Sequence, residues 1–236
     1  MVMHDADSGR LDGPTRLSFS AIVFDLDGVL VHSSDSVQRS WREWAVRQGL
    51  DVETVMAATH GRRSVDTIRE VAPQMPAERA AAELEALQAL DTYGIRPGIG
   101  AAELLRSLLP HEWAIATSGT RALAYARLDA AGLPRPEILV AGDDVAHGKP
   151  SPDGFRLAVR LLELLASECI VIEDAPAGVA AARAAGLRVV GITNGDDPGR
   201  LGDVDAVTEH CGALRVVRES AANLFLSVSQ DAFAAD

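Results

Sequence analysis

Short apolar runs alternate with segments of helical spacing along most of the chain, and each run has the length of a buried strand. The runs are rich in isoleucine, valine and alanine and occupy residues 21–24, 113–116, 138–140, 169–172 and 189–192. The predicted helices between them cover residues 101–109, 121–131, 154–165 and 177–185, and a last short strand is expected at 205–207. Strands that alternate with helices predict a parallel sheet with right-handed crossovers. The expected fold class is α/β.

The pattern changes between residues 33 and 96, where helical spacing continues and no strand-like run occurs. Trp41 and Trp44 lie on one helical repeat, and we expect them in the core of a small helical bundle. The bundle interrupts an α/β core domain made of residues 18–32 and 97–225. Residues 1–17 and 226–236 are expected to be flexible termini.

Polar clusters follow directly after three of the predicted strands. They are Asp25-Leu26-Asp27-Gly28, Thr117-Ser118-Gly119 and Glu173-Asp174, and Gly148-Lys149-Pro150 precedes a predicted helix. In an open α/β sheet the ligand crevice lies outside the carboxyl ends of the strands. These clusters are therefore expected to converge on one small volume, as in a phosphoryl-transfer site.

Asp25 and Asp27 have the spacing of a nucleophile and an acid/base pair. Asp25 at the strand end would attack phosphorus and form an aspartyl phosphate. Asp27 would protonate the leaving alcohol and then take a proton from water. Gly28 allows the sharp turn that both side chains need. The alternative is an ordinary Asp-Gly turn after a strand.

The adjacent carboxylates of Glu173 and Asp174 indicate a bound cation. Magnesium prefers oxygen ligands, usually one or two carboxylates with water and substrate phosphate. Asp25 and Asp174 would supply these, with the Asp27 carbonyl and Glu173 as secondary ligands. The alternative is a helix N-cap at Asp174 before Pro176, which would leave Glu173 unexplained.

Lys149 and the Thr117-Ser118-Gly119 segment are the candidate phosphate-binding groups. A lysine at the start of a helix is disfavoured by the helix dipole, so a role in neutralising transferred phosphate explains it better than stability does. The hydroxyl and N–H groups of residues 117–119 lie ahead of a helix and form a natural phosphate cradle. A solvated loop lysine and a plain capping turn remain the alternatives.

Composition limits the classes of partner. The formal net charge of −12 argues against a nucleic-acid role, and it makes a local cation more necessary for an anionic substrate. No apolar run approaches the length of a membrane span, and the first residues lack the regions of a signal peptide. With two cysteines, a reduced protein of the cytoplasm is expected.

Together the four clusters resemble the motifs of the haloacid dehalogenase superfamily, over about residues 19–210. Segments 60–68, 113–121 and 173–178 are similar to its small sugar phosphate and glycerol phosphate phosphatases. The resemblance implies a Rossmann-like core with an α-helical cap domain at 33–96. It also implies site roles: catalytic Asp25, Asp27 and Lys149; phosphate-binding Thr117, Ser118 and Gly119; and magnesium ligands Asp25, Asp27, Asp174 and Glu173.

We therefore predict a magnesium-dependent phosphomonoesterase that hydrolyses a small sugar or polyol phosphate as a monomer, with no nucleic-acid or membrane partner. Arg63, next to Arg62 in a turn between two cap helices, is a candidate substrate ligand. One alternative is a phosphosugar mutase of the β-phosphoglucomutase kind, which returns the phosphate to the sugar. A scaffold without catalytic activity is the other.

Overall fold

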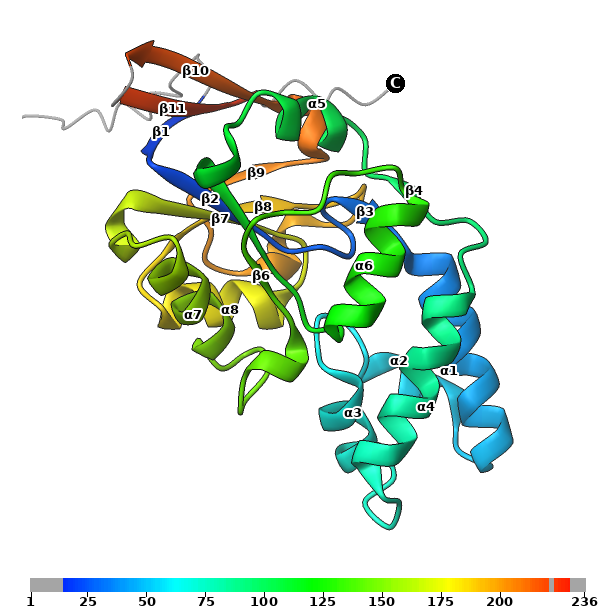
Figure 1. The fold of residues 1–236 in the computed structure, drawn as a ribbon. Coiled ribbons are helices and arrows are strands. Elements are labelled where there is room, and N and C mark those ends of the chain that lie inside the picture. The colour runs from blue at the N-terminus through cyan, green and yellow to red at the C-terminus, as the bar shows by residue number, and fades with distance from the viewer. Residues whose placement is uncertain (1–14, 221–222, 230–236) are drawn as a thin grey trace, which may run out of the picture.

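The computed structural model describes residues 15–220 and 223–229, so the predictions for residues 1–14 and 230–236 lie outside the described part. Its centre is a parallel six-stranded sheet with the order β6-β5-β2-β7-β8-β9 (Figure 1). The strands are β2 Ala21–Phe24, β5 Trp113–Ala116, β6 Leu139–Val140, β7 Cys169–Glu173, β8 Arg188–Ile192 and β9 Ala206–Thr208. This confirms the predicted α/β fold class with a parallel sheet.

Both faces of the sheet are covered, which explains why its strands are uninterrupted apolar runs. In β2, Ile22 and Phe24 pack with residues of the helices on one face, and Ala21 and Val23 pack with residues of the helices on the other. The first face carries α5 Ala101–Arg106 and α6 Arg121–Ala130, and the second carries α7 Asp153–Leu161 and α8 Pro176–Ala184. Five 3₁₀ turns connect described elements at Pro110–Glu112, Gly142–Asp144, Ala166–Glu168, Pro198–Leu201 and Cys211–Ala213.

Four helices between residues 33 and 96 form the cap, which lies beside the core at the lower right of Figure 1. They are α1 Ser34–Gln48, α2 Val52–Ala57, α3 Ser64–Val71 and α4 Ala77–Leu90. Trp41 and Trp44 are buried in the cap's own apolar cluster and contact each other edge to face. The short strands β3 Val31–His32 and β4 Arg96–Pro97 pair antiparallel, so the chain enters and leaves the cap side by side.

A small antiparallel sheet corrects the prediction for the chain ends. It consists of β1 Thr15–Phe19, β11 Asn223–Val228 and β10 Leu214–Ser220, in that order. Residues 15–17 and 226–228, which were expected to be flexible, are paired in it. Alternate residues of β11 are buried against the core, and this one-sided pattern is too short to stand out in the sequence.

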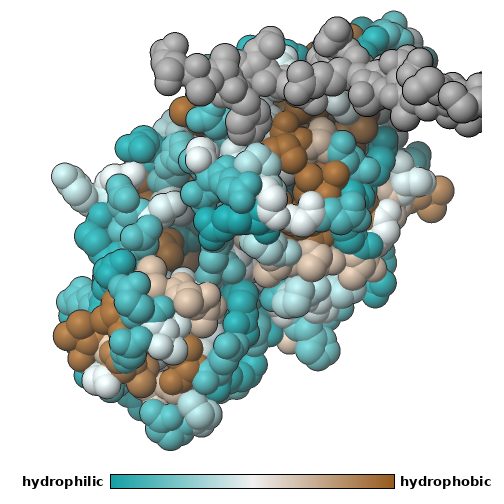
Figure 2. All heavy atoms as spheres, turned by 180° about the vertical axis from the view of Figure 1, so that it is seen from behind, coloured by the Kyte–Doolittle hydropathy of each residue, from teal (hydrophilic) through white to brown (hydrophobic). Residues whose placement is uncertain are grey.

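The surface seen from behind is mostly hydrophilic, with apolar residues scattered over the cap lobe at the lower left (Figure 2). Within the described ranges, no helix has the length and apolar character that a membrane crossing requires.

Candidate active site

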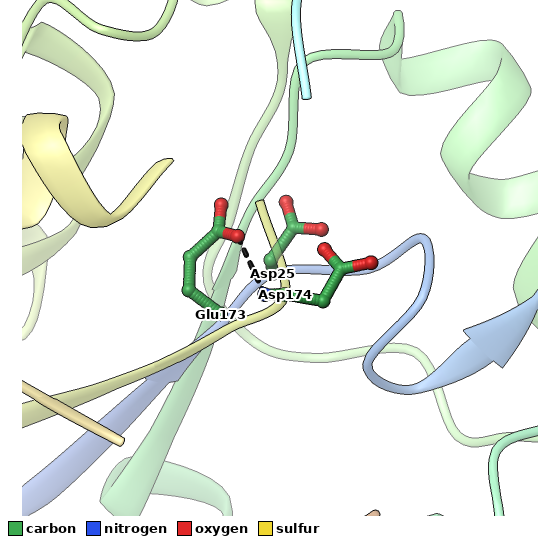
Figure 3. A group of neighbouring side chains, drawn as sticks. All are labelled: Asp25, Glu173 and Asp174. Atoms are coloured by element: carbon green, nitrogen blue, oxygen red, sulfur yellow. Dashed lines mark hydrogen bonds between the residues drawn. The ribbon is translucent and has the colours of Figure 1, made fainter. Parts of the chain in front are cut away.

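Neighbouring strands bring three carboxylates to one edge of the sheet. β2 and β7 run parallel with Phe24 opposite Ile172. Asp25, the residue after β2, therefore lies at the same edge as Glu173, the last residue of β7, and Asp174, which follows it. The Asp25 N–H donates to the Ile172 carbonyl at 2.9 Å, which fixes the strand end. The carboxyl groups of Asp25, Glu173 and Asp174 lie together above this edge (Figure 3), with one oxygen from each within 4.8 Å of the others.

Lys149 lies among these carboxylates. Its Nζ donates to Asp25 Oδ1 at 2.5 Å and to Glu173 Oε1 at 2.6 Å, and its side chain is 9% exposed. Burial would lower the pKa of Lys149, but the facing carboxylates of Asp25 and Glu173 raise it, so the ammonium stays charged. One ammonium thus faces three carboxylates in a site with little access to water.

The excess of carboxylates over cations is reflected in raised pKa values of the carboxyl groups. Burial, opposed by Lys149 and reinforced by Glu173, raises the pKa of Asp25 to about 7. Burial also raises the pKa of Asp174. Buried carboxyl groups whose pKa is raised in this way lack a counter-cation, and an oxygen-rich set of this kind suits a divalent ion such as magnesium. The residues present therefore fit the metal that the sequence predicts.

Glu173 is held in place by contacts to both of its oxygens. Oε2 accepts from the N–H groups of Asp174 and Ala175 at 2.7 Å each, and Oε1 accepts from Lys149. A Cβ at Gly178 would lie 1.6 Å from Oε1, so this glycine of the motif leaves room for the carboxylate. With both oxygens engaged, Glu173 positions Lys149, and Asp25 and Asp174 are the better candidates for direct metal ligands.

Asp27 lies on the cavity side of the Gly28 turn. Its Oδ1 accepts from Ser33 Oγ at 2.5 Å, and its Oδ2 forms an ion pair with Arg127 Nη1. Its carboxylate is not part of the three-residue acidic group. Gly28 has φ +82°, and its N–H donates to the Val31 carbonyl, which closes the turn.

The predicted phosphate cradle follows β5. Thr117 is nearly buried, and its N–H donates to Val140 O at 2.9 Å. Thr117 Oγ1 accepts from Gly119 N at 3.2 Å, and Ser118 Oγ donates to Gly61 O in the cap at 2.9 Å. Residues 117–119, Asp25, Asp27 and Asp174 all line one cavity of about 370 Å³.

The cap closes this cavity from the other side. Glu85 Oε2 accepts from Thr120 N at 3.0 Å, and a Cβ at Gly61 would lie 2.6 Å from Ala175 Cβ, so cap and core are in close contact. His60 Nε2 lies 3.6 Å from Asp174 Oδ2, and the nearby Asp174 carboxylate raises the pKa of His60 against the effect of burial. The site is therefore built from both parts of the chain.

Comparison with known proteins identifies the family. A family model described as haloacid dehalogenase-like hydrolase matches residues 19–186. The chain belongs to the haloacid dehalogenase-like hydrolases. This confirms the predicted family. The prediction of a phosphatase is confirmed as well, because the curated relatives described next are phosphatases.

Two relatives and one solved structure illustrate the similarity. Hexitol phosphatase A of Escherichia coli strain K12 is 42% identical over 204 residues, covering 84% of this hydrolase and 94% of the relative. Glycerol-1-phosphate phosphohydrolase 2 of Saccharomyces cerevisiae is 33% identical over 197 residues, 78% of each protein. The crystal structure of a hydrolase from Pseudomonas syringae superposes with a TM-score of 0.73 at 29% identity, over 81% of this chain and 94% of that one.

Arg63, which was predicted to be a substrate ligand, does not line the cavity of this hydrolase. Its guanidinium donates to the carbonyls of Gly142, Val145 and Ala146 at 3.0–3.2 Å and forms an ion pair with Asp66. A Cβ at Gly148 would lie 2.5 Å from Arg63 Nε, so the glycine before Lys149 makes room for this side chain. Arg63 thus ties the cap to the loop that carries Lys149. Arg62, paired with Glu70, lines the cavity in its place.

Arg127 is a site residue that was not predicted from the sequence. It lies on α6 among buried Leu123, Ala124 and Leu128, and its side chain is 7% exposed. An arginine on the apolar face of an amphipathic helix is the signal that was available, because such a charge is buried only when it is paired. Here the partner is Asp27.

Proposed function

We propose that this hydrolase is a magnesium-dependent phosphomonoesterase that acts on a small sugar or polyol phosphate through a phosphoaspartate at Asp25. The supporting observation is the different environment of the two aspartates at the Gly28 turn. Asp25 keeps Oδ2 without a hydrogen bond from the described residues, while Oδ1 is held by Lys149. Asp27 has both oxygens engaged on the cavity side. Asp25 therefore has an oxygen available for attack, and Asp27, which lines the same cavity, is in place for proton transfer.

In the first step, an Asp25 oxygen forms a bond to phosphorus and the bond from phosphorus to the ester oxygen breaks. Asp27 gives a proton to the departing alcohol oxygen. In the second step, Asp27 takes a proton from a water molecule, whose oxygen attacks phosphorus. The bond from phosphorus to Asp25 then breaks, and inorganic phosphate leaves.

The surrounding groups hold the phosphate during both steps. Lys149 offsets negative charge beside Asp25, and Thr117 and Ser118 with their neighbouring N–H groups line the same cavity. Magnesium held by Asp25 and Asp174 would neutralise phosphate charge, which matters in a protein with net charge −12. The names of the relatives, a hexitol phosphatase and a glycerol phosphate phosphohydrolase, support a small polyol or sugar as the leaving group.

Phosphate release from a panel of small phosphates tests this proposal. The panel contains glycerol, hexitol, hexose and 2-deoxyhexose phosphates and β-glucose 1-phosphate, each assayed with magnesium and with EDTA. We expect magnesium-dependent release by the native protein and a loss of at least about 1000-fold for Asp25→Asn, which lacks the nucleophile. Conversion of β-glucose 1-phosphate to glucose 6-phosphate without phosphate release would instead establish a mutase. Equal rates for native protein and Asp25→Asn would refute the mechanism.

A further inference from the structure

Helix α4 contributes two buried polar side chains to the cavity wall opposite the core. Glu85 and Gln88 are 6% and 5% exposed, and both line the cavity that contains Asp25 and Asp27. They are three positions apart, so they lie on the same face of the helix. A helix that only completed the cap's core would carry apolar residues at these positions, as it does at Leu84.

Gln88 has an unused hydrogen-bond donor. Its Nε2 is buried and has no partner among residues 15–220 and 223–229. Three other buried side-chain atoms in this part of the chain are also unpartnered, on Thr193, Thr208 and His210, and none of these residues lines the cavity. Leaving such a donor unpaired destabilises a folded protein, so a partner that arrives with a ligand accounts for it.

Glu85 places an acceptor beside this donor. Oε2 is fixed by the Thr120 N–H at 3.0 Å, and Oε1 has no hydrogen bond from the described residues. A donor and an acceptor side by side match the hydroxyls of a polyol, because each hydroxyl can both donate and accept.

The charge of the cavity opposes a second anionic group on the ligand. Its walls carry five carboxylates, including Glu85, and two guanidinium groups. Both guanidinium groups are already paired, Arg127 with Asp27 and Arg62 with Glu70. A phosphate at the α4 end would approach the Glu85 carboxylate without a free arginine or lysine from that wall to offset it.

We propose that Glu85 and Gln88 form a subsite for the uncharged hydroxyls of a polyol monophosphate and disfavour ligands that carry a second phosphate at that end. The inference rests on the proposed phosphatase activity and narrows its substrate class. It also separates this enzyme from a mutase, because transfer of the phosphoryl group to a sugar monophosphate produces a bisphosphate, which the subsite would repel.

The first experiment compares sorbitol 6-phosphate with hexyl phosphate, which has the same number of carbons and no hydroxyls. Gln88→Met keeps the length of the side chain and removes its polar atoms. We expect kcat/KM for sorbitol 6-phosphate to fall about 5- to 150-fold, the range for leaving one buried hydrogen-bonding group unpaired. The value for hexyl phosphate should change less than about twofold. Gln48→Met, on an exposed position at the end of α1, is the matched control and should change neither.

Thermal unfolding separates this role from a structural one. If Gln88 served only the cap's stability, Gln88→Met would lower the Tm and reduce both rates together. Removal of an unpaired buried donor should instead leave the Tm of the free protein unchanged or raise it. A lower Tm with equal losses on both substrates, or an unchanged rate with sorbitol 6-phosphate, overturns the proposal for Gln88.

The second experiment compares sorbitol 6-phosphate with sorbitol 1,6-bisphosphate in the native protein and in Glu85→Gln. The variant retains an acceptor for Thr120 N and removes the charge. In the native protein we expect kcat/KM to be higher for the monophosphate than for the bisphosphate. In Glu85→Gln the ratio of the two values should be smaller by about tenfold or more. An unchanged ratio contradicts the charge argument. A native protein that hydrolyses none of the three phosphates but releases phosphate from another member of the panel above overturns the inference alone. No release from any of these compounds refutes the proposed function itself, and the inference with it.

Discussion

Gly28 belongs to the turn after Asp25 and Asp27 and lies against the proposed metal ligand Asp174, so replacing it with alanine is a direct test of the site. Its φ of +82° is a left-handed conformation, which costs a residue with a side chain about 1–2 kcal/mol. An added Cβ would also lie 1.8 Å from Asp174 Oδ2. Ordinary contact begins near 3.4 Å, so the carboxylate would have to withdraw by about 1.6 Å.

This displacement determines the expected loss of activity. A misplacement of about 1 Å in a catalytic site can reduce the rate 100-fold. We expect kcat of Gly28→Ala to fall by about 100-fold or more, and the magnesium concentration for half-maximal activity to rise. The Tm should fall by about 2–8 °C from the backbone strain, at 2–4 °C per kcal/mol for a chain of this size.

Gly49→Ala is the matched control. Gly49 ends α1 at φ +67°, and an added Cβ would have no atom within 4 Å. It should lose a similar amount of thermal stability and keep native kcat and magnesium dependence. Phosphate release at several magnesium concentrations and thermal unfolding of both variants are the assays. Native activity in Gly28→Ala, or an equal loss in both, would refute the assignment of Asp174 to the metal site.

Two further predictions concern stability. Arg63→Met removes a nearly buried guanidinium from three carbonyls and should lower the free energy of unfolding by about 2–3 kcal/mol. Arg62→Met, at a more exposed ion pair, should lower it by less than about 1 kcal/mol. Equal losses for the two variants in urea unfolding would contradict the contact between cap and core. In metal-free protein the pKa of Asp25 is about 7, above its unfolded value, so the folded state retains a proton that the unfolded state loses. The stability of native protein relative to Asp25→Asn should therefore fall as pH rises from about 4 to 7, and magnesium should reduce this fall; a difference that grows with pH in EDTA would refute it.

The core half of the site could be predicted because strand ends are fixed by the sheet. A buried parallel strand is an uninterrupted apolar run, so Asp25 and Asp174 are found by reading past the end of each run. Register then follows from the fold, since adjacent parallel strands end at the same edge. The four helices of the cap also lie within the segment 33–96 that was predicted to be helical, because no strand-like apolar run interrupts it.

The contacts between cap and core could not be predicted in the same way. Arg63 was expected to bind substrate because it follows a glycine turn, yet its orientation depends on the position of the 142–148 loop, 79 residues further along the chain. Arg127 is 100 residues from its partner Asp27. Helical periodicity identifies the face on which a residue lies but not which distant element packs against that face. The strands β1, β10 and β11 were missed for a related reason, because their burial depends on pairing between the two ends of the chain.

The motif glycines explain why short sequence clusters carry so much information here. Gly28, Gly148 and Gly178 each lie where a Cβ would meet Asp174, Arg63 or Glu173 at 2.5 Å or less. Each of these charged side chains bears on another part of the site: Asp174 is a proposed metal ligand, Arg63 contacts the loop before Lys149, and Glu173 contacts Lys149. A glycine beside each charge is therefore a requirement of the packing, and it adds a second fixed position to every cluster. Cap residues such as Gln88 have no such neighbour, and only the cavity itself indicates their role.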